Sequence, residues 1–435
     1  MDTILFQLKK LIPQKLFSIL QPIYHYALAL FGALVYRFPS RKIIVVGVTG
    51  TKGKTSVIEL TNALLEHAGY KTALLNTVRY KIDDESYDNK FKMTMPGRLF
   101  VQSLLRKAVQ KKCQYALIEM TSEGARQYRH KFIAMDALIF TNLAPEHIES
   151  HGSYEKYREA KLSIAKALAA SKKARTIMVA NKDDNEGGRF LNVSVKEKYP
   201  YALPDAEPYE ISQDEMWFTF GGARIQTRLR GRFNLYNILA ALTFAKSQNV
   251  STEVMKRAIE SFNGIPGRME SITLPSTSPL RSKQDFVVVV DYAHTPDSLA
   301  KVYDVFQHSR KICVLGATGG GRDRWKRKEM GRIAGDQCTH VILTNEDPYD
   351  ENPRDIVEDV ASGMTQPIYR IIMDRREAIR EALKEAETSD TVIITGKGTD
   401  PYIMGPNNTK LPWSDARVAR EELERVLQSR VSVKQ

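Results

Sequence analysis

A glycine-rich loop between an apolar run and a helical pattern constrains the fold of this chain more than any other sequence feature. Residues 42–48 are rich in β-branched residues, as is typical of a buried strand, and residues 54–67 show the period of a helix. The loop between them leads into the helix as Gly50-Thr51-Lys52-Gly53-Lys54-Thr55-Ser56. Glycines let backbone N–H groups surround phosphate oxygens, and the N-terminus of the next helix adds a partial positive charge. This arrangement predicts a nucleotide-phosphate site on an α/β sheet.

The loop keeps the residue types of a phosphate-binding loop but not the usual spacing. In the common G-x-x-x-x-G-K-[ST] pattern a glycine would stand at position 48, and here that residue is Val48. Lys54 is expected to reach the β- and γ-phosphates, and the Thr55 hydroxyl is expected to bind Mg²⁺. The alternative is a glycine-rich turn with a purely structural role.

Apolar strand candidates alternate with helical patterns, which indicates an α/β fold with mostly parallel sheets covered on both faces. In the first half the strand candidates are 71–75, 115–120, 136–141 and 176–180. After a turn-rich segment at 263–267, a second series has strand candidates at 287–290, 311–315, 341–344, 368–373 and 391–395. We therefore predict a short N-terminal helical segment at 1–40, a central phosphate-loop domain at 41–265, and a C-terminal Rossmann-like α/β domain at 266–435.

Composition excludes several classes of protein. With 43% hydrophobic and 26% charged residues, the 435-residue chain is globular rather than disordered or fibrous. Its net charge of +13 comes from scattered basic residues without a zinc-finger or RNA-recognition signature, so no nucleic-acid partner is expected. A positive field suits an enzyme that attracts anionic substrates. Cys113, Cys313 and Cys338 lack metal-type spacing and are predicted to be reduced, buried thiols of a cytosolic protein.

The N-terminal stretch 16–36 is apolar but is interrupted by Gln21, Pro22 and His25. The uninterrupted part is shorter than the ~20 residues that a membrane-spanning helix needs, and no small-residue cleavage pattern follows. Two interpretations remain open. The segment is either a helix docked on the protein's own core or a helix lying on an anionic membrane surface beside the lysines at positions 9, 10 and 15. A cytoplasmic location fits both.

Together with the phosphate loop, four further motifs resemble the Mur ligase family. They are Glu-Met-Thr-Ser at 119–122, Phe-Thr-Asn-Leu-Ala-Pro-Glu-His at 140–147, Gly-Arg-Phe-Asn-Leu-Tyr-Asn at 231–237, and Gly-Arg-Met-Glu at 267–270 followed by Asp-Tyr-Ala-His-Thr-Pro at 291–296. The likeness covers residues 43 to about 420, in order. Asp-Arg-Arg-Glu-Ala-Ile at 374–379 and Gly-Lys-Gly at 396–398 are most similar to the members that add the third peptide residue to UDP-N-acetylmuramoyl-L-alanyl-D-glutamate.

The resemblance implies an ATP-dependent, ADP-forming ligase of peptidoglycan precursor synthesis. A substrate carboxylate attacks the γ-phosphate of ATP, and an incoming amine, expected to belong to diaminopimelate or lysine, displaces phosphate from the acyl-phosphate. Because the first step brings anions together, its catalytic demand is charge neutralisation and positioning. The implied catalytic residues are Lys54, Glu119, His147 and Lys161. Thr55 and Glu119 are the implied ligands of one Mg²⁺, and His147 and a carbamylated Lys161 those of a second.

The resemblance also implies binding residues, and a protein that acts as a monomer. ATP is expected to contact Gly50, Thr51, Lys52, Gly53, Lys54, Thr55, Ser56, Asn237, Arg268, Asp291 and His294. The UDP-muramoyl-peptide and the amino acid are expected to contact Thr94, Thr121, Ser122, Gln127, Arg129, Arg324, Arg327, Asp347, Gly396 and Asp400.

Three departures from the family pattern leave the substrate open. The stretch before the phosphate loop is shorter than the family's UDP-binding domain, so how or whether UDP is bound is not decided. Diaminopimelate-adding members carry Asp-Asn-Pro-Arg, whose arginine grips the distal carboxylate, whereas this chain has Glu346-Asp347-Pro348-Tyr349. Glu123 replaces a usual histidine, and Gly-Lys-Gly-Thr-Asp at 396–400 replaces Gly-Lys-Gly-His-Glu.

Two other functions are considered. Folylpolyglutamate synthase shares the acyl-phosphate chemistry and the Asp-Tyr-Ala-His stretch at 291–294, but Asp-Arg-Arg-Glu at 374–377 argues against it. A nucleotide-binding partner subunit without ligase activity is the second alternative. The intact residues at positions 54, 119, 147 and 161 argue against that subunit.

Overall fold

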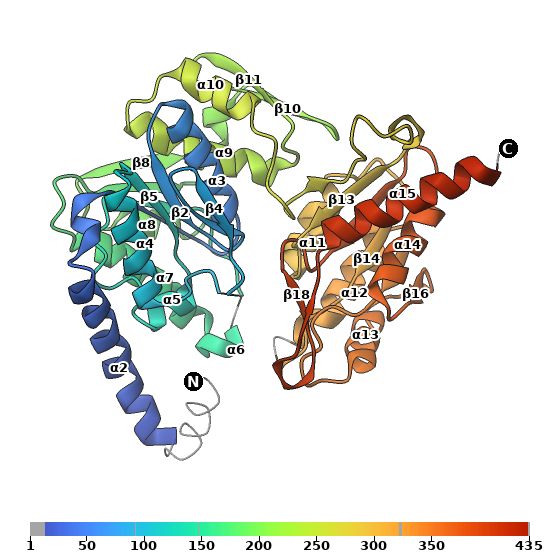
Figure 1. The fold of residues 1–435 in the computed structure, drawn as a ribbon, viewed down its shortest axis with the longest axis horizontal. Helices are drawn as coiled ribbons and strands as arrows, with labels where there is room; N and C mark the ends of the chain where they lie inside the picture. The colour runs from blue at the N-terminus through green and yellow to red at the C-terminus, as the bar shows by residue number, and fades with distance from the viewer. Residues whose placement is uncertain (1–13, 92, 147, 322–323, 434–435) are drawn as a thin grey trace. The chain divides into compact units, whose positions relative to one another are not determined.

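The computed structural model of the protein describes residues 14–91, 93–146, 148–321 and 324–433, which form two compact units (Figure 1). The first unit contains the described residues up to 207 together with 220–223 and 236–259. The second unit contains 208–219, 224–235 and the chain from 260 onward. His147, which was predicted to be a catalytic residue and a metal ligand, lies outside the described residues.

A mostly parallel sheet forms the centre of the first unit, as the sequence predicts. Its eight strands, counted over the described residues, follow the order β4-β3-β2-β5-β1-β6-β7-β8; β3 pairs in antiparallel fashion with both β2 and β4, and the other pairs are parallel. Every residue of β2, β5, β6 and β7 is buried, which explains their continuous apolar sequences. The strands are β1 Ile44–Thr49, β2 Thr72–Leu75, β3 Arg79–Ile82, β4 Glu85–Asp88, β5 Tyr115–Glu119, β6 Ala137–Phe140, β7 Ile177–Asn181 and β8 Glu197–Tyr201.

Helices follow most strands of this sheet, and two of them carry predicted site residues. Helix α3 starts at Lys54 at the end of the phosphate loop, and α7 carries Lys161. The helices of residues 14–260 are α2 Gln14–Val35, α3 Lys54–His67, α4 Arg98–Gln110, α5 Ser122–Arg126, α6 Ile148–His151, α7 Tyr154–Ala169, α8 Gly187–Leu191, α9 Arg232–Ser247 and α10 Thr252–Glu260, with short 3-10 turns at Pro39–Lys42 and Leu203–Ala206. A small sheet of order β11-β10-β9 contains β9 Tyr209–Ile211, β10 Met216–Phe220 and β11 Ala223–Thr227.

The second unit is a doubly wound α/β fold, so the predicted Rossmann-like arrangement is present. Its sheet has the order β12-β13-β17-β14-β15-β16, with β12 antiparallel and the remaining pairs parallel. Alternate strand residues enter two cores: Cys313 and Leu315 pack with α11, α12 and α13, whereas Ile312 and Val314 pack with α14 and α15. The elements are β12 Glu270–Ser271, β13 Val287–Asp291, α11 Pro296–Asp304, β14 Lys311–Leu315, α12 Trp325–Gln337, β15 His340–Leu343, α13 Pro353–Ala361, β16 Tyr369–Ile371, α14 Arg375–Glu385, β17 Thr391–Thr395, β18 Tyr402–Met404, β19 Lys410–Pro412 and α15 Asp415–Val433, with 3-10 turns at Arg281–Lys283 and Pro406–Asn408.

The prediction that the cysteines are reduced thiols is wrong for two of them. Cys313 in β14 and Cys338 at the end of α12 form a disulfide, with 6.3 Å between their Cα atoms. The residues are 25 positions apart in the sequence, and only the packing of α12 against the sheet brings them together. Spacing alone cannot reveal such a pair. Cys113 is a buried free thiol, as predicted.

The N-terminal helix α2 contacts α4 through small side chains. Ala29 and Ala33 of α2 are buried, and a Cβ built on Gly32 would lie 3.5 Å from Leu99 Cδ2 of α4. This face of α2 is docked on the protein, as the first of the two interpretations expects. Within the described part of the chain, no helix has the length and apolar character that crossing a bilayer requires.

Candidate functional site

The phosphate loop turns sharply between β1 and α3 at two glycines. Gly50 has a φ of 149° and Gly53 a φ of 83°, conformations that side chains disfavour. A Cβ on Gly50 would lie 2.0 Å from Thr141 Oγ1, and one on Gly53 would lie 2.2 Å from Asn237 Oδ1. Asn237, predicted to bind ATP, therefore lies directly against the phosphate loop. Both glycines are required for steric reasons.

The segment after β6 holds this loop in shape. Thr51 N donates to Asn142 O at 2.8 Å, and Lys52 N donates to the Asn142 side-chain oxygen at 2.9 Å. Thr141 Oγ1 returns a hydrogen bond to Lys52 O at 2.7 Å. The Thr-Asn pair of the motif at 140–147 thus supports the loop backbone, and loop amides that are not used here remain available to an anion.

Two predicted metal ligands meet beside the loop. Thr55 Oγ1 donates to Glu119 Oε2 at 2.9 Å, and Lys54 Nζ lies 3.9 Å from Glu119 Oε1. Glu119 is only 3% exposed at the end of β5, which is paired with β1. Hydroxyl and carboxylate oxygens are the ligands that Mg²⁺ prefers, so this pair fits the first predicted metal.

Thr77 is a residue of this site that the sequence did not identify. Its backbone N–H donates to Glu119 Oε2 at 3.0 Å, and its hydroxyl donates to the same carboxylate at 3.1 Å. The hydroxyl of Thr77 is also 2.9 Å from that of Thr94, a residue predicted to bind the precursor. Thr77 belongs to no motif, and its only sequence signal is its position just after the apolar strand at 72–75. It connects Glu119, a predicted metal ligand, to Thr94, a predicted precursor-binding residue.

Lys161 lies in the same loop region although it is far away in the sequence. It is 2% exposed on α7, and its Nζ donates to Gly50 O at 2.6 Å. Burial, reinforced by the positive charge of Lys54, holds the pKa of Lys161 well below its ordinary value. The side chain also lies over the Tyr157 ring at 4.9 Å, and Tyr157 Oη is 2.9 Å from Thr51 Oγ1. A lowered pKa increases the fraction of lysine present as a neutral, nucleophilic amine.

The predicted precursor-binding residues of the first unit gather around α5. Thr121 Oγ1 accepts from Gly124 N at 3.0 Å and caps this helix, while Ser122 Oγ is 3.1 Å from His151 Nε2. Arg129 donates to Gln127 Oε1 at 2.8 Å and to the backbone oxygen of Met95. These contacts fix the side chains in place before any substrate binds.

In the second unit, the predicted ATP residues lie at the carboxyl end of β13. Asp291 accepts from Met269 N at 2.8 Å and from Ala293 N at 2.7 Å, so its carboxylate shapes two loops. The Arg268 guanidinium lies over the Tyr292 ring at 4.3 Å, and His294 Nδ1 is 2.7 Å from Tyr292 O. Ligands of open α/β sheets commonly bind at this edge.

A buried acidic cluster lies at the ends of β15 and β17. Lys397, which is 1% exposed, pairs with Asp347 at 2.8 Å and with Asp400 at 3.1 Å. Glu346 Oε1 accepts from Thr318 Oγ1 at 2.8 Å, whereas its buried Oε2 has no hydrogen-bond partner among the described residues. Burial raises the pKa of Glu346, although Lys397 opposes the shift. Glu346 was not predicted as a site residue, and its signal was its place in the motif that follows β15.

Gly396 allows this cluster to form. Its φ is 105°, and a Cβ there would lie 2.3 Å from Glu346 Oε2. The predicted residues Asp347, Gly396 and Asp400 are therefore brought together. The site has two acids around one lysine and one further carboxylate oxygen without a donor, which suits a ligand that carries ammonium groups.

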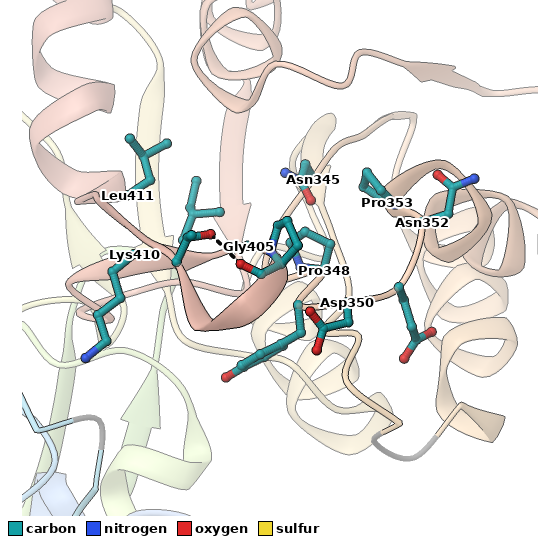
Figure 2. Close-up of a pocket in the computed structure, with 13 residues that line it drawn as sticks. Asn345, Pro348, Asp350, Asn352, Pro353, Gly405, Lys410 and Leu411 are labelled. Atoms are coloured by element: carbon teal, nitrogen blue, oxygen red, sulfur yellow. Dashed lines mark hydrogen bonds between the residues drawn. The ribbon is translucent and has the colours of Figure 1, made fainter. Parts of the chain in front are cut away.

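A cavity of about 660 Å³ opens beside the loop that follows Glu346 and Asp347. Figure 2 shows its two sides, the loop after β15 and the β18–β19 hairpin. Its lining residues are Asn345, Pro348, Tyr349, Asp350, Glu351, Asn352, Pro353, Ile403, Gly405, Pro406, Thr409, Lys410 and Leu411. Tyr349, at the position where diaminopimelate-adding members of the family carry an arginine, is a lining residue. Aromatic and acidic groups thus replace a guanidinium in this cavity.

Arg324 and Arg327, both predicted to bind substrate, differ in their surroundings. Arg327 is completely buried, and its guanidinium pairs with Glu351 at 2.8 Å and with Asp359 at 3.0 Å. These ion pairs therefore link α12 to α13 and to the loop after β15. Arg324 is 65% exposed at its side chain and lies 3.4 Å from Asp359. Neither arginine is a lining residue of the cavity.

Comparison with known proteins adds a family context. Family models match residues 48–245 as a Mur ligase middle domain and residues 267–398 as a Mur ligase glutamate ligase domain. The UDP-N-acetylmuramyl-tripeptide synthetase of Roseiflexus sp. (strain RS-1) is 37% identical over 425 residues, which cover 91% of this chain and 82% of that protein.

Solved structures give the same picture. A UDP-N-acetylmuramoyl-L-alanyl-D-glutamate–2,6-diaminopimelate ligase matches with a TM-score of 0.60 and 27% identity, covering 89% of this chain and 79% of that one. Folylpolyglutamate synthase of Mycobacterium tuberculosis complexed with ADP matches with a TM-score of 0.68 at 15% identity, covering 86% and 92%. The second likeness shows only that the fold is shared.

Proposed function

This chain belongs to the Mur ligase family, and we propose that it joins a diamino acid to the glutamate carboxylate of UDP-N-acetylmuramoyl-L-alanyl-D-glutamate while converting ATP to ADP and phosphate. The observation that carries this proposal is the convergence of Thr55, Glu119 and Lys161 on one phosphate loop. The relative named above is a tripeptide synthetase, and a structural relative is a diaminopimelate ligase. Synthesis of a peptidoglycan precursor is the corresponding biological role.

In the first step, the phosphate loop residues from Gly50 to Ser56 hold the phosphates of ATP. Lys54 neutralises the charge that gathers when a carboxylate approaches the γ-phosphate. Thr55 and Glu119 would hold a Mg²⁺ ion, which supplies charge neutralisation at the phosphate oxygens when it is bound. Thr77 keeps the Glu119 carboxylate oriented through two donors. The role of the protein's own residues is therefore to position the reacting groups.

Lys161 is proposed to carry a carbamate. Its neutral amine forms a bond to the carbon of CO₂ and releases a proton, so that an uncharged amine becomes an anionic oxygen ligand. The buried position and the lowered pKa of Lys161 favour this reaction, because only an unprotonated amine has a lone pair to attack. With His147, the carbamate would hold a second Mg²⁺.

The remaining predicted residues are proposed to bind the three substrates. In the first unit Asn237 takes the adenine side of ATP, and Thr94, Thr121, Ser122, Gln127 and Arg129 take the muramoyl-peptide. In the second unit Arg268, Asp291 and His294 contact ATP. These roles rest on the motif positions and on the contacts described above.

The amino-acid subsite is proposed to lie at Glu346, Asp347, Gly396 and Asp400, with the adjoining cavity. A diamino acid supplies ammonium donors, and Glu346 Oε2, which has no hydrogen-bond partner among the described residues, offers it an acceptor. Tyr349 in place of arginine removes the partner of a distal carboxylate, which favours L-lysine over diaminopimelate. Arg324, whose side chain is 65% exposed, is the remaining arginine candidate for a carboxylate partner.

The enzyme is further proposed to be cytoplasmic and monomeric, with an N-terminal segment that contacts a membrane surface. The domain division proposed for it is 1–40, 41–265 and 266–435. The family models match within the second and third of these parts.

A substrate panel tests the proposed function. Phosphate release is measured with ATP, Mg²⁺ and the UDP-dipeptide in the presence of L-lysine, meso-diaminopimelate, L-ornithine or glutamate. Turnover that requires both the dipeptide and a diamino acid is expected, and mass spectrometry should detect the new amide. Turnover only with glutamate and a pterin acceptor would overturn the proposal in favour of a folylpolyglutamate synthase. No turnover with any pair would favour the partner-subunit alternative.

A further inference from the structure

The outer face of α2 is the largest concentration of exposed apolar side chains in the described chain. Seven of the thirteen exposed large hydrophobic residues lie on this one helix of 22 residues. Six of them, with exposed fractions between 47% and 64%, are Leu20, Ile23, Tyr24, Phe31, Leu34 and Val35. We call these six the apolar stripe. Such a concentration is unusual on a protein surface and marks a site of interaction.

Helical geometry gathers the apolar stripe on one side. Leu20 and Tyr24 are four residues apart, Tyr24 and Phe31 are seven apart, and Phe31 and Leu34 are three apart, spacings that place residues on the same helix face. The opposite face holds Ala29 and Ala33 against α4, and Tyr26 meets the rings of Tyr128 and Phe132 edge-on. The helix is thus fixed to its unit with the stripe directed outward. Figure 1 shows α2 extending beyond the other helices of the first unit.

The charges around α2 all have the same sign. The sequence contains no Asp or Glu between Asp2 and Glu59, whereas basic residues flank the helix on both sides. Lys9 and Lys10 precede the helix in the sequence, Lys15 is its second residue, and Arg37, Arg41 and Lys42 follow it. The three that follow the helix are exposed. An apolar face bordered by cations is complementary to the surface of an anionic bilayer.

The same features disfavour a protein helix as the occupant. From Leu16 to Tyr36 the sequence has no Asp, Glu, Lys or Arg. A helix that pairs with another helix normally has charges beside its seam, which set register and partner choice. We propose that α2 docks on an anionic lipid bilayer, with the apolar stripe in the interface and the exposed Arg37, Arg41 and Lys42 at the headgroups. This inference does not depend on the ligase activity.

Vesicle co-sedimentation of the full chain tests the proposal. Vesicles of phosphatidylcholine with phosphatidylglycerol are compared with vesicles of phosphatidylcholine alone. We expect binding to the anionic vesicles that weakens strongly in about 1 M NaCl, where the Debye length is only about 3 Å. A full chain that stays in the supernatant with anionic vesicles at low salt would overturn the proposal.

Variants separate the apolar and the charged contributions. F31E/L34E should lower the partition into anionic vesicles more than tenfold, and R37Q/R41Q/K42Q should remove most of the preference for anionic lipid, because basic residues near the surface are attracted to anionic headgroups. Tyr87→Glu is the matched control, because Tyr87 on β4 is as exposed as Leu20 but lies outside the stripe. It should bind vesicles like the unsubstituted protein.

Two further measurements keep the result interpretable. Thermal unfolding and phosphate release in lipid-free buffer should be unchanged in F31E/L34E, which shows that the variant is folded and that the ligase site is intact. Light scattering after gel filtration gives the oligomeric state. A dimer that F31E/L34E dissociates would overturn the proposal in favour of a second copy on the stripe, as would vesicle binding that F31E/L34E leaves unchanged.

Discussion

The hydroxyl of Thr55 donates to Glu119 Oε2 at 2.9 Å, which joins the first turn of α3 to the end of β5 beside the phosphate loop. The two residues are 64 positions apart, and the parallel pairing of β1 and β5 brings them together. The pair that is proposed to bind Mg²⁺ therefore depends on sheet register. A one-residue shift would turn Glu119 to the other face.

Removing the charge of Glu119 should stop the first chemical step. Glu119→Gln keeps the shape and the hydrogen bond from Thr55 but loses the anion that would hold Mg²⁺. We expect kcat to fall by about 100-fold or more, the order seen when one group that stabilises a charged transition state is lost. Steady-state phosphate release measures the effect. The control is Glu159→Gln on the surface of α7, which should retain its activity.

Replacing Lys161 should inactivate the enzyme in a way that small acids repair. Lys161→Ala leaves a space beside Gly50 O where a formate or acetate ion can take the place of the carbamate. Activity should return in part as the carboxylate concentration rises. Lys166→Ala, one turn or so along the same helix and 68% exposed, is the control. A fully active Lys161→Ala enzyme would exclude the role.

The stability of the carbamate-free protein should depend on pH through Lys161. The folded pKa is lowered, so between that value and about 10.5 the unfolded chain binds one more proton than the folded chain. The free energy of unfolding therefore falls as pH decreases through this window. Lys161→Met cannot titrate at this position. The melting temperature of this variant should therefore rise relative to that of the unmodified protein when the pH is lowered from 9 to 7. Thermal unfolding in CO₂-free buffer tests this, and a constant difference would contradict the lowered pKa.

A methyl group on the phosphate loop should destabilise the nucleotide site. Gly53→Ala forces a side chain into a positive φ and to within 2.2 Å of Asn237 Oδ1. The left-handed backbone alone costs about 1–2 kcal/mol, and the clash displaces Asn237. Calorimetric titration with ADP should show a loss of affinity. Gly188→Ala is the control, because that Cβ would meet nothing within 4 Å, and it should bind ADP normally.

Restoring an arginine to the cavity should change the choice of amino acid. Tyr349→Arg places a guanidinium among the lining residues, where it can pair with a distal carboxylate. We expect the ratio of kcat/KM for meso-diaminopimelate to that for L-lysine to rise about tenfold, as one charged hydrogen bond allows. Glu346→Gln should reduce kcat/KM for both. An unchanged ratio would mean that the distal end binds elsewhere.

Sequence patterns predicted the features that are determined by short stretches of the sequence. The strand at β1, the helix at α3 and the loop between them follow from β-branched residues, helical period and glycines, and the structure matches each within a few residues. The doubly wound second unit followed from the strand–helix alternation. Each depends on interactions between residues close in sequence.

Features that depend on distant contacts were missed or misjudged. Thr77 supports Glu119 from a loop without any motif. Arg327 was considered as a substrate ligand, yet its acidic partners lie 24 and 32 residues further along the chain and hold it in the interior. The Cys313–Cys338 disulfide is a third case. Only tertiary packing determines which partners such residues have.

The hydrogen bond from Lys161 to the carbonyl of Gly50 also bears on how the enzyme matures. The nitrogen of the proposed carbamate would keep one N–H, so this bond would survive if the amine took up CO₂. The folded backbone around Gly50 then serves as a template that exists before the modification, and the ligand is added to it without rebuilding the loop. Freshly synthesised protein would accordingly fold first and acquire its activity afterwards, at a rate set by dissolved inorganic carbon.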